Sequence, residues 1–264
     1  MGVARPRIFF DTNVCGKLTS SYKKHALPFM AEVRKRYRIA VAPTTVFELL
    51  RSFKPGTAAY FHQDQAKFRA CICGDDFPRY MELPVDFAMR RILGIPNANI
   101  DESRQYVKAI LKAGSQAEVF KVFNPQKLAT VFGEGVSQYA WWLENAKSHQ
   151  HPFPSPEEWG VRWWSNYEGF KGPISEEQGA SLGKGLTALY AYQKATFEKA
   201  QANPNLKVEK RLGDRVDLQQ LVYLLEPDMH FLTDDKDIKI RASASEQSQR
   251  ILMLSELMTT FGFL

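Results

Sequence analysis

The sequence predicts an α/β fold in which helices cover both faces of a central parallel β-sheet. Three observations support this prediction. Short apolar runs with the length of buried strands alternate with segments of helical periodicity near the amino end. The same alternation returns near the carboxyl end, and a long, mainly helical stretch separates the two. Because helices lie between consecutive strands, the strands should run parallel.

The amino-terminal segments supply the first two predicted strands. Residues 7–11 form a short apolar run that ends at a carboxylate, as expected for a buried strand followed by a turn. Residues 19–38 predict a basic helix, and a second apolar strand over 39–42 stops at Pro43. A threonine cap and apolar residues at helical spacing then predict a helix over 44–51.

A tryptophan-rich, mainly helical insertion is predicted over residues 55–204, between the core segments 1–54 and 205–264. Its helical periodicity is clearest in four ranges: 64–72, 101–113, 126–148 and 176–202. We expect the last of these helices to break near 182–187. The stretch 149–173 is rich in proline and aromatic residues and predicts an ordered loop, because so many rings are seldom left in solvent.

The carboxyl-terminal segment returns to alternating strands and helices. Residues 213–225 predict an amphipathic helix with acids in its first turn. An apolar strand follows over 229–232, then a polar turn and a helix that begins near 235. A last apolar strand is predicted over 250–254. These elements complete the sheet that the amino-terminal strands begin.

Composition limits the class of protein. The chain has 264 residues, of which 44% are hydrophobic and 24% charged, as in globular proteins. No apolar run approaches the ~20 residues of a membrane helix, and the first ten residues lack a signal-peptide pattern. We therefore expect a soluble, cytoplasmic protein without membrane association, whose three cysteines are free thiols. The net charge of +6 is compatible with nucleic acid, anionic lipid or solubility alone.

Carboxylates lie where the predicted strands end and where the neighbouring helices begin. Asp11 closes the first strand, Asp234 and Asp235 follow a later one, and Glu48 and Asp217 lie near helix starts. Ligands of open parallel sheets bind at this edge, so acids from four segments should converge there. Such acids would repel one another, and a hard divalent cation such as Mg²⁺ or Mn²⁺ relieves that repulsion.

Each acid also has a local explanation. Glu48 can complete a capping box with Thr45 and stabilise only its own helix. The other acids can cap a helix or close an Asx-turn: Asp11, Asp214, Asp217 and Asp234. Convergence of four such caps at one edge by chance is the less favoured reading.

With these acids, the sequence resembles the PIN-domain nucleases. The resemblance rests on four segments in order and a closing strand: 8–13, 45–51, 217–223, 232–238 and 250–257. It covers about residues 1–54 and 205–264, while the long insertion departs from the compact family pattern. It implies a PIN-like three-layer fold with a central parallel sheet and a metal-dependent nuclease activity.

The resemblance assigns roles to individual residues. The catalytic, metal-binding acids would be Asp11, Glu48, Asp217 and Asp235. Asp214 would be a fifth metal ligand or replace Asp217, and Asp234 competes with Asp235. Residues that orient the ligands would be Thr12, Asn13, Thr233, Asp234 and Asp237. The cofactor would be Mg²⁺ or Mn²⁺, which activates water for phosphodiester cleavage.

The expected substrate is single-stranded or structured RNA. Basic residues that could contact its phosphates are Lys23, Lys24, Arg34 and Arg51, although each could equally be a solvated or ion-paired surface residue. The leading hypothesis is an endoribonuclease, with a toxin or phage-defence role and an antitoxin or other regulatory protein as implied partner. The sequence leaves open whether the chain forms a homo-oligomer. The alternatives are an inactive PIN scaffold that binds RNA or protein, and a flap-like nuclease acting on DNA.

Overall fold

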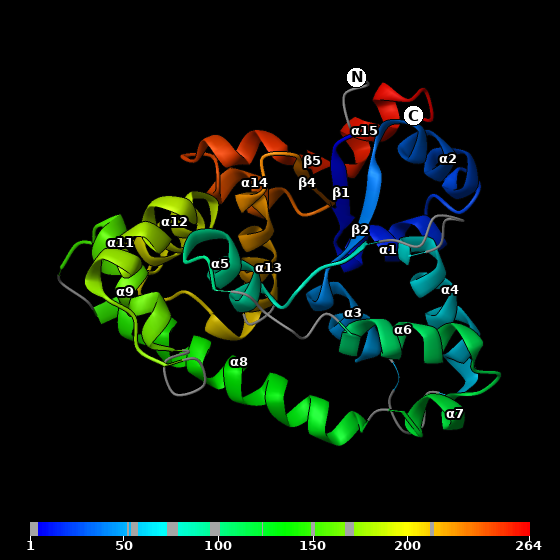
Figure 1. Cartoon of the computed structure of the whole chain (residues 1–264), viewed down its shortest axis with the longest axis horizontal. Coiled ribbons are helices and arrows are strands. Elements are labelled where there is room, and N and C mark those ends of the chain that lie inside the picture. Colours follow the sequence, from blue (N-terminus) through cyan, green and yellow to red (C-terminus); the bar gives the residue numbers. More distant parts are fainter. Residues whose placement is uncertain are drawn as a thin grey trace.

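The chain folds around a five-stranded, all-parallel sheet with strand order β3-β2-β1-β4-β5 (Figure 1). The computed structural model describes residues 5–51, 53, 58–72, 79–95, 101–122, 124–148, 151–166, 172–211 and 214–264. Helices lie on both sides of the sheet. The predicted α/β class with a central parallel sheet is therefore confirmed.

The strands lie close to their predicted positions. Their bounds are β1 (Arg7–Phe10), β2 (Arg38–Val41), β3 (Arg79–Tyr80), β4 (Met229–Thr233) and β5 (Ile251–Met253). The sequence did not predict β3, because two residues carry no alternating pattern. In the centre of the sheet, Phe9 of β1 pairs in register with Phe231 of β4.

The helices of the two core segments differ from prediction near the amino end and in the segment before β4. They are α1 (Thr12–Thr19), α2 (Ala26–Arg36), α3 (Pro43–Leu50), α13 (Asp214–Gln220), α14 (Lys236–Arg241) and α15 (Leu254–Thr260). Short 3₁₀ turns are η3 (Leu221–Leu225) and η4 (Glu246–Arg250). The helix predicted over 19–38 is confirmed only over the range of α2, and α1 was not predicted. The second half of the helix predicted over 213–225 is the 3₁₀ turn η3. The hydroxyls of Thr19 and Ser20 donate to the Gly16 carbonyl, and this competing hydrogen bonding ends α1 before α2 begins.

The insertion is mainly helical, as predicted. Its helices are α4 (Phe61–Ile72), α5 (Pro84–Ile92), α6 (Asp101–Lys112), α7 (Gln116–Phe120), α8 (Pro125–Ser148), α9 (Pro156–Ser165), α11 (Glu176–Gly185) and α12 (Thr187–Ala202). Two 3₁₀ turns are η1 (Ala58–Tyr60) and η2 (Val208–Arg211). The loop predicted over 149–173 is wrong for α9, which a capping box between Ser155 and Glu158 initiates. The predicted break near 182–187 falls at Leu186.

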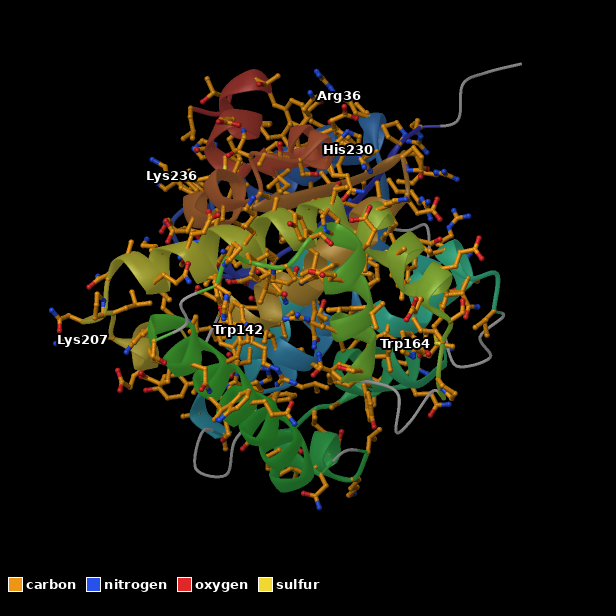
Figure 2. The ribbon with its side chains drawn as sticks, turned by 90° about the vertical axis from the view of Figure 1, so that its left-hand side faces the viewer. Arg36, Trp142, Trp164, Lys207, His230 and Lys236 are labelled. Carbon is orange, nitrogen blue, oxygen red and sulfur yellow. The ribbon has the colours of Figure 1, made fainter. Side chains whose placement is uncertain are left out.

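Two hydrophobic cores lie on the two faces of the sheet. Alternate residues of a strand point to opposite faces, so Phe9 packs with one core while Ile8 and Phe10 pack with the other. The Phe9 core contains residues from α5, α8, α9, α11 and α12, whereas the other contains residues from α4, α6 and α7. Helices of the insertion thus complete both cores. Trp142 and Trp164 lie within this insertion packing in Figure 2.

The tryptophans divide into buried and exposed residues. Trp159, Trp163 and Trp164 are buried in the Phe9 core, which favours a packing role for that part of the insertion. Trp141 on α8 is 70% exposed instead. A base-stacking role in the insertion is therefore open to Trp141 but not to the three buried rings.

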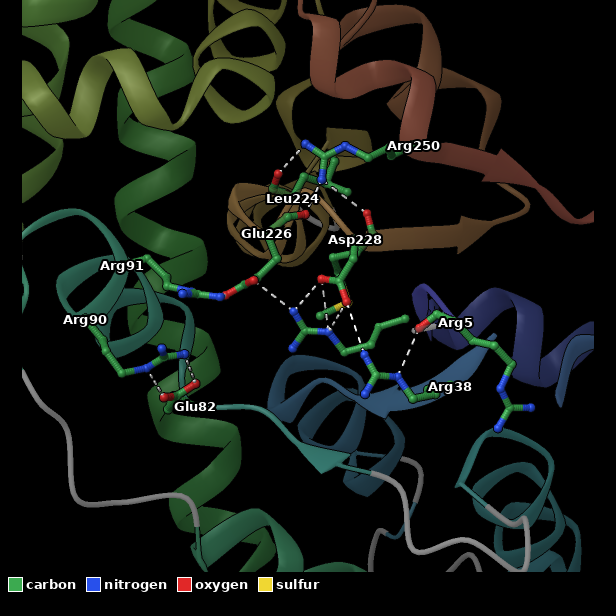
Figure 3. Close-up of polar contacts among 11 residues, drawn as sticks. Arg5, Arg38, Glu82, Arg90, Arg91, Leu224, Glu226, Asp228 and Arg250 are labelled. Atoms are coloured by element: carbon green, nitrogen blue, oxygen red, sulfur yellow. Dashed lines mark hydrogen bonds and ion pairs between the residues drawn. The ribbon is translucent and has the colours of Figure 1, made fainter. Parts of the chain in front are cut away.

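A network of arginines and acids ties the amino-terminal edge of the sheet together (Figure 3). Arg7 at the start of β1 forms an ion pair at 2.9 Å with Glu226 and one at 2.6 Å with Asp228. Arg38 at the start of β2 reaches the same Asp228 at 3.3 Å. Arg250 donates to main-chain carbonyls of the segment that leads into β4. The ion pairs of Arg7 and Arg38 thus link the starts of β1 and β2 to the segment that leads into β4.

Two further findings bear on the expectations from composition. Cys15 is buried in α1 and takes part in a disulfide, so the prediction of free thiols is wrong for this residue. None of the helices in the described part of the chain combines the length and the apolar character needed to span a bilayer.

Candidate functional site

Asp11 is the central acid at the carboxyl-terminal edge of the sheet. It follows β1 directly and its side chain is only 1% exposed. Thr233, at the end of the neighbouring β4, donates to Asp11 Oδ2 at 2.7 Å, and the Thr12 hydroxyl lies 3.2 Å from Oδ1. Burial raises the pKa of Asp11, and these hydroxyl groups oppose the increase. Both oxygens of the carboxylate are therefore held in a fixed orientation.

Glu48 joins Asp11 through Thr12. The Thr12 hydroxyl donates to Glu48 Oε2 at 2.7 Å, so a single hydroxyl links the two carboxylates. Burial raises the pKa of Glu48 to about 7, and the charge of Asp11 adds to that increase. The capping-box explanation fails, because Thr45 instead donates to the Phe10 carbonyl at 2.7 Å. That bond fixes α3 against the end of β1.

Asp217 is the third acid of the cluster. It lies in the first turn of α13, which packs against α3. Burial raises the pKa of Asp217 to about 9, and the next largest causes are the charges of Asp11 and Glu48. The charge of Asp235 contributes as well. The acids predicted from four distant segments are thus close enough to repel one another.

The structure separates Asp214 from Asp217. Asp214 Oδ2 lies 2.5 Å from the buried guanidinium of Arg241 on α14. The same guanidinium pairs with Asp237 at 2.9 Å, and Asp237 also pairs with Arg211 at 2.9 Å. Asp214 and Asp237 are therefore engaged in an ion-pair network beside the cluster. The charge of Asp214 raises the pKa of Asp217 less than the charges of Asp11, Glu48 and Asp235 do.

The turn after β4 positions the last predicted residues. Asp235 caps α14, since its Oδ1 accepts from the Asp237 amide at 2.8 Å. Asp234 lies 3.3 Å from Lys17, and its amide donates to Asn13 Oδ1 at 3.0 Å. Asp234 is therefore paired away from Asp217, whereas Asp235 acts on it electrostatically. The sequence predicted Asp234 as the cap of this helix, but the capping residue is Asp235.

The four predicted phosphate-contacting residues do not gather in one place. Arg51 follows α3 and lies close enough to Glu48 for its charge to oppose the raised pKa of that acid. Lys23 and Lys24 lie in the exposed turn beyond α1, one helix away from Asp11. Arg34 belongs to the last turn of α2, which leads into β2 at the opposite edge of the sheet. Of the four, Arg51 alone is shown near the acids.

The donor set fits a hard divalent cation in its chemistry. Three carboxylates with raised pKa values share one buried region, and oxygen ligands are those that Mg²⁺ and Mn²⁺ prefer. Among the described residues, no three His, Cys, Asp or Glu side chains already stand at ligating geometry.

Two polar side chains of the site were not predicted from the sequence. Gln220 on α13 is fully buried and lies near enough to Asp11 to lower its pKa. It follows Asp217 by three residues, so helical spacing could have revealed it. Tyr139 reaches the neighbourhood of Asp217 from α8 of the insertion. No sequence signal links residues so far apart in the chain.

Comparison with known proteins gives no relative. No protein-family model matches the chain, and neither does any curated protein or solved structure. The resemblance to PIN-domain nucleases therefore rests on the sequence segments around the acids.

Proposed function

We propose that this chain is a metal-dependent nuclease with a PIN-like core that hydrolyses RNA phosphodiester bonds. The observation that carries the proposal is the gathering of Asp11, Glu48 and Asp217 in one buried region at the carboxyl-terminal edge of the sheet. Keeping such acids together destabilises a protein unless a cation or proton neutralises them. Asp235 is the fourth acid of the proposed set.

Each residue of the site would have its own role in such a reaction. A bound Mg²⁺ or Mn²⁺ would supply water activation and neutralise the charge that develops on phosphate. Asp11, Glu48 and Asp217 would hold the ion, while Thr12 and Thr233 keep the Asp11 oxygens oriented. Glu48, whose pKa is raised to about 7, can also accept a proton near neutral pH.

RNA is the proposed substrate, and its support is indirect. The net charge of +6 and Arg51 beside the acids suit a phosphate-rich ligand. RNA in preference to DNA, the toxin or defence role and the antitoxin partner come from the family resemblance alone. An inactive scaffold is disfavoured because a protein without a metal would gain stability by losing these acids.

The deciding experiment measures cleavage of labelled single-stranded RNA and DNA with Mn²⁺ or Mg²⁺. Asp11→Asn, which removes charge but little volume, and excess EDTA should each abolish cleavage. Glu48→Gln should act likewise, whereas the matched control Glu256→Gln, at an exposed residue paired with Lys239, should cleave like the wild type. Unchanged cleavage by a folded Asp11→Asn protein refutes the proposal. Cleavage of DNA alone overturns its RNA part.

A further inference from the structure

Tyr139 carries a buried hydroxyl group that lacks a hydrogen bond. Its side chain is 7% exposed, and within the described residues the hydroxyl finds no hydrogen-bond partner. The ring stacks on Trp142 at a centroid distance of 5.6 Å. Helix α8 packs against α13, and the charges of Asp214 and Asp217 act on this hydroxyl. An unpaired polar group therefore borders the acid cluster.

A neighbouring tyrosine in the same surroundings has a hydroxyl group that is hydrogen-bonded. Tyr192 on α12 is 1% exposed and also lies within the fields of Asp214 and Asp217. Its hydroxyl accepts from Arg241 Nη1 at 3.1 Å. The surroundings of the acids thus supply a partner to Tyr192 but none to Tyr139.

Gln220 is a second polar side chain of this kind. It is 0% exposed, and neither its amide nitrogen nor its amide oxygen makes a regular hydrogen bond within the described part of the protein. It lies one helical turn beyond Asp217 on α13 and beside Asp11. Tyr139 and Gln220 thus border Asp217 from two different helices.

Unpaired polar groups that cluster at one place indicate an absent ligand. Burying a hydroxyl or an amide without a partner destabilises a fold, and native proteins contain few such groups. Both groups can donate a hydrogen bond, and both lie beside the proposed cation site. A ligand that bears anionic oxygens, once a cation offsets the acids, would satisfy the two donors.

We infer that Tyr139 and Gln220 form a polar subsite that donates hydrogen bonds to the phosphodiester group of a strand bound at the acid cluster. The inference rests on the proposed nuclease function and adds a substrate contact from the insertion. It makes α8 part of the substrate-binding site as well as part of the fold. The bonds would form to the non-bridging oxygens, which carry the negative charge of the phosphodiester.

The test compares Tyr139→Phe with the matched control Tyr192→Phe. Binding of a labelled single-stranded RNA is measured by fluorescence anisotropy in an Asp11→Asn background with Mg²⁺, and thermal unfolding is followed for each variant. Tyr139→Phe should weaken binding about tenfold, the loss expected for one hydrogen bond to a charged group. Its unfolding temperature should stay level or rise, because no hydrogen bond of the fold is lost. Tyr192→Phe should lower the unfolding temperature and leave binding unchanged.

The outcomes separate this subsite from the proposed function. The subsite is refuted if the Tyr139→Phe variant binds RNA as tightly as the protein with Tyr139, or if its unfolding temperature is as low as that of Tyr192→Phe. Neither result would refute the nuclease activity. If the wild type neither binds nor cleaves nucleic acid, both the subsite and the function fall. Gln220→Leu gives an independent check, since it should weaken RNA binding without lowering the unfolding temperature.

Discussion

The acid cluster makes a prediction about stability that needs no substrate. An acid whose pKa is raised in the folded state binds its proton more tightly there than in the unfolded chain. Stability is then fully present below the ordinary pKa and falls as pH rises toward the folded value. For Glu48 that window runs from 4.5 to about 7, and Asp217 extends it to about 9. The metal-free protein should therefore lose stability as the solution becomes more alkaline.

The size of this loss follows from the shift of Glu48. One pKa unit corresponds to about 1.4 kcal/mol, so an increase from 4.5 to about 7 amounts to about 3 kcal/mol of unfolding free energy. Asp217 adds to the loss, but its titration is coupled to that of Asp11, so the contributions do not sum. Asp11→Asn removes the second largest cause of the Glu48 shift, and we expect it to restore about 1 kcal/mol near pH 8.

Urea unfolding followed by tryptophan fluorescence measures this prediction between about pH 5 and pH 8. In EDTA the unfolding free energy of the wild type should fall across this range, and Mn²⁺ should cancel most of the fall by binding the ionised acids. Asp11→Asn should show a shallower fall and little response to Mn²⁺. A wild-type protein equally stable at both pH values in EDTA would refute the reasoning that these acids are buried together.

The remaining predictions concern packing and charge outside the cluster. Gly183→Ala should lower the unfolding free energy in urea by about 3 kcal/mol, because the new Cβ would lie 1.7 Å from the Pro156 carbonyl oxygen. The matched control Gly16→Ala should leave the unfolding free energy unchanged, because no atom of a neighbouring segment lies within 4 Å of its Cβ position. Arg241→Met should cost about 3 kcal/mol, because the largely buried Asp214 carboxylate would keep only Arg211, at 4.0 Å, as a cationic partner, and a loss below about 1 kcal/mol would contradict that role. Trp141→Ala should change stability by less than about 0.5 kcal/mol, since the ring is 70% exposed; a larger loss in the same unfolding assay would reveal packing that this exposure excludes.

Sequence patterns predicted the central sheet well because its strands are short apolar runs bounded by clear signals. Residues 7–11 and 229–232 show this, and the structure pairs these two segments in register. Sequence patterns predicted helix boundaries wrongly where a local side-chain hydrogen bond starts or ends a helix. Thr19 and Ser20 end α1 through hydroxyl bonds to the preceding turn, at the start of the stretch that was predicted to be one helix. A capping box likewise starts α9 within an aromatic stretch that looked like a loop.

The sequence predicted two pairs of candidate acids for the site, but it could not decide which acid of each pair belongs to the cluster. Asp214 and Asp217 lie one turn apart on the same face of α13, so helical spacing places both toward the sheet. The choice depends on Arg241, which is a neighbour in space but lies more than twenty residues further along the chain, and which pairs with Asp214 at 2.5 Å. The same holds for Asp234 and Asp235, because Lys17 on a distant helix pairs with the first.

The insertion explains why the core acids are buried at all. A bare sheet edge would leave Asp217 in water, where its pKa would stay near 3.8, but α8 of the insertion packs against α13 and helps to exclude solvent. Desolvation is the largest cause of the raised pKa of Asp217, ahead of any neighbouring charge. Helices of the insertion therefore set the electrostatics of the proposed site. It follows that substitutions in α8 that loosen its packing on α13 should lower the pKa of Asp217 and flatten the pH dependence of stability, without any change to an acid.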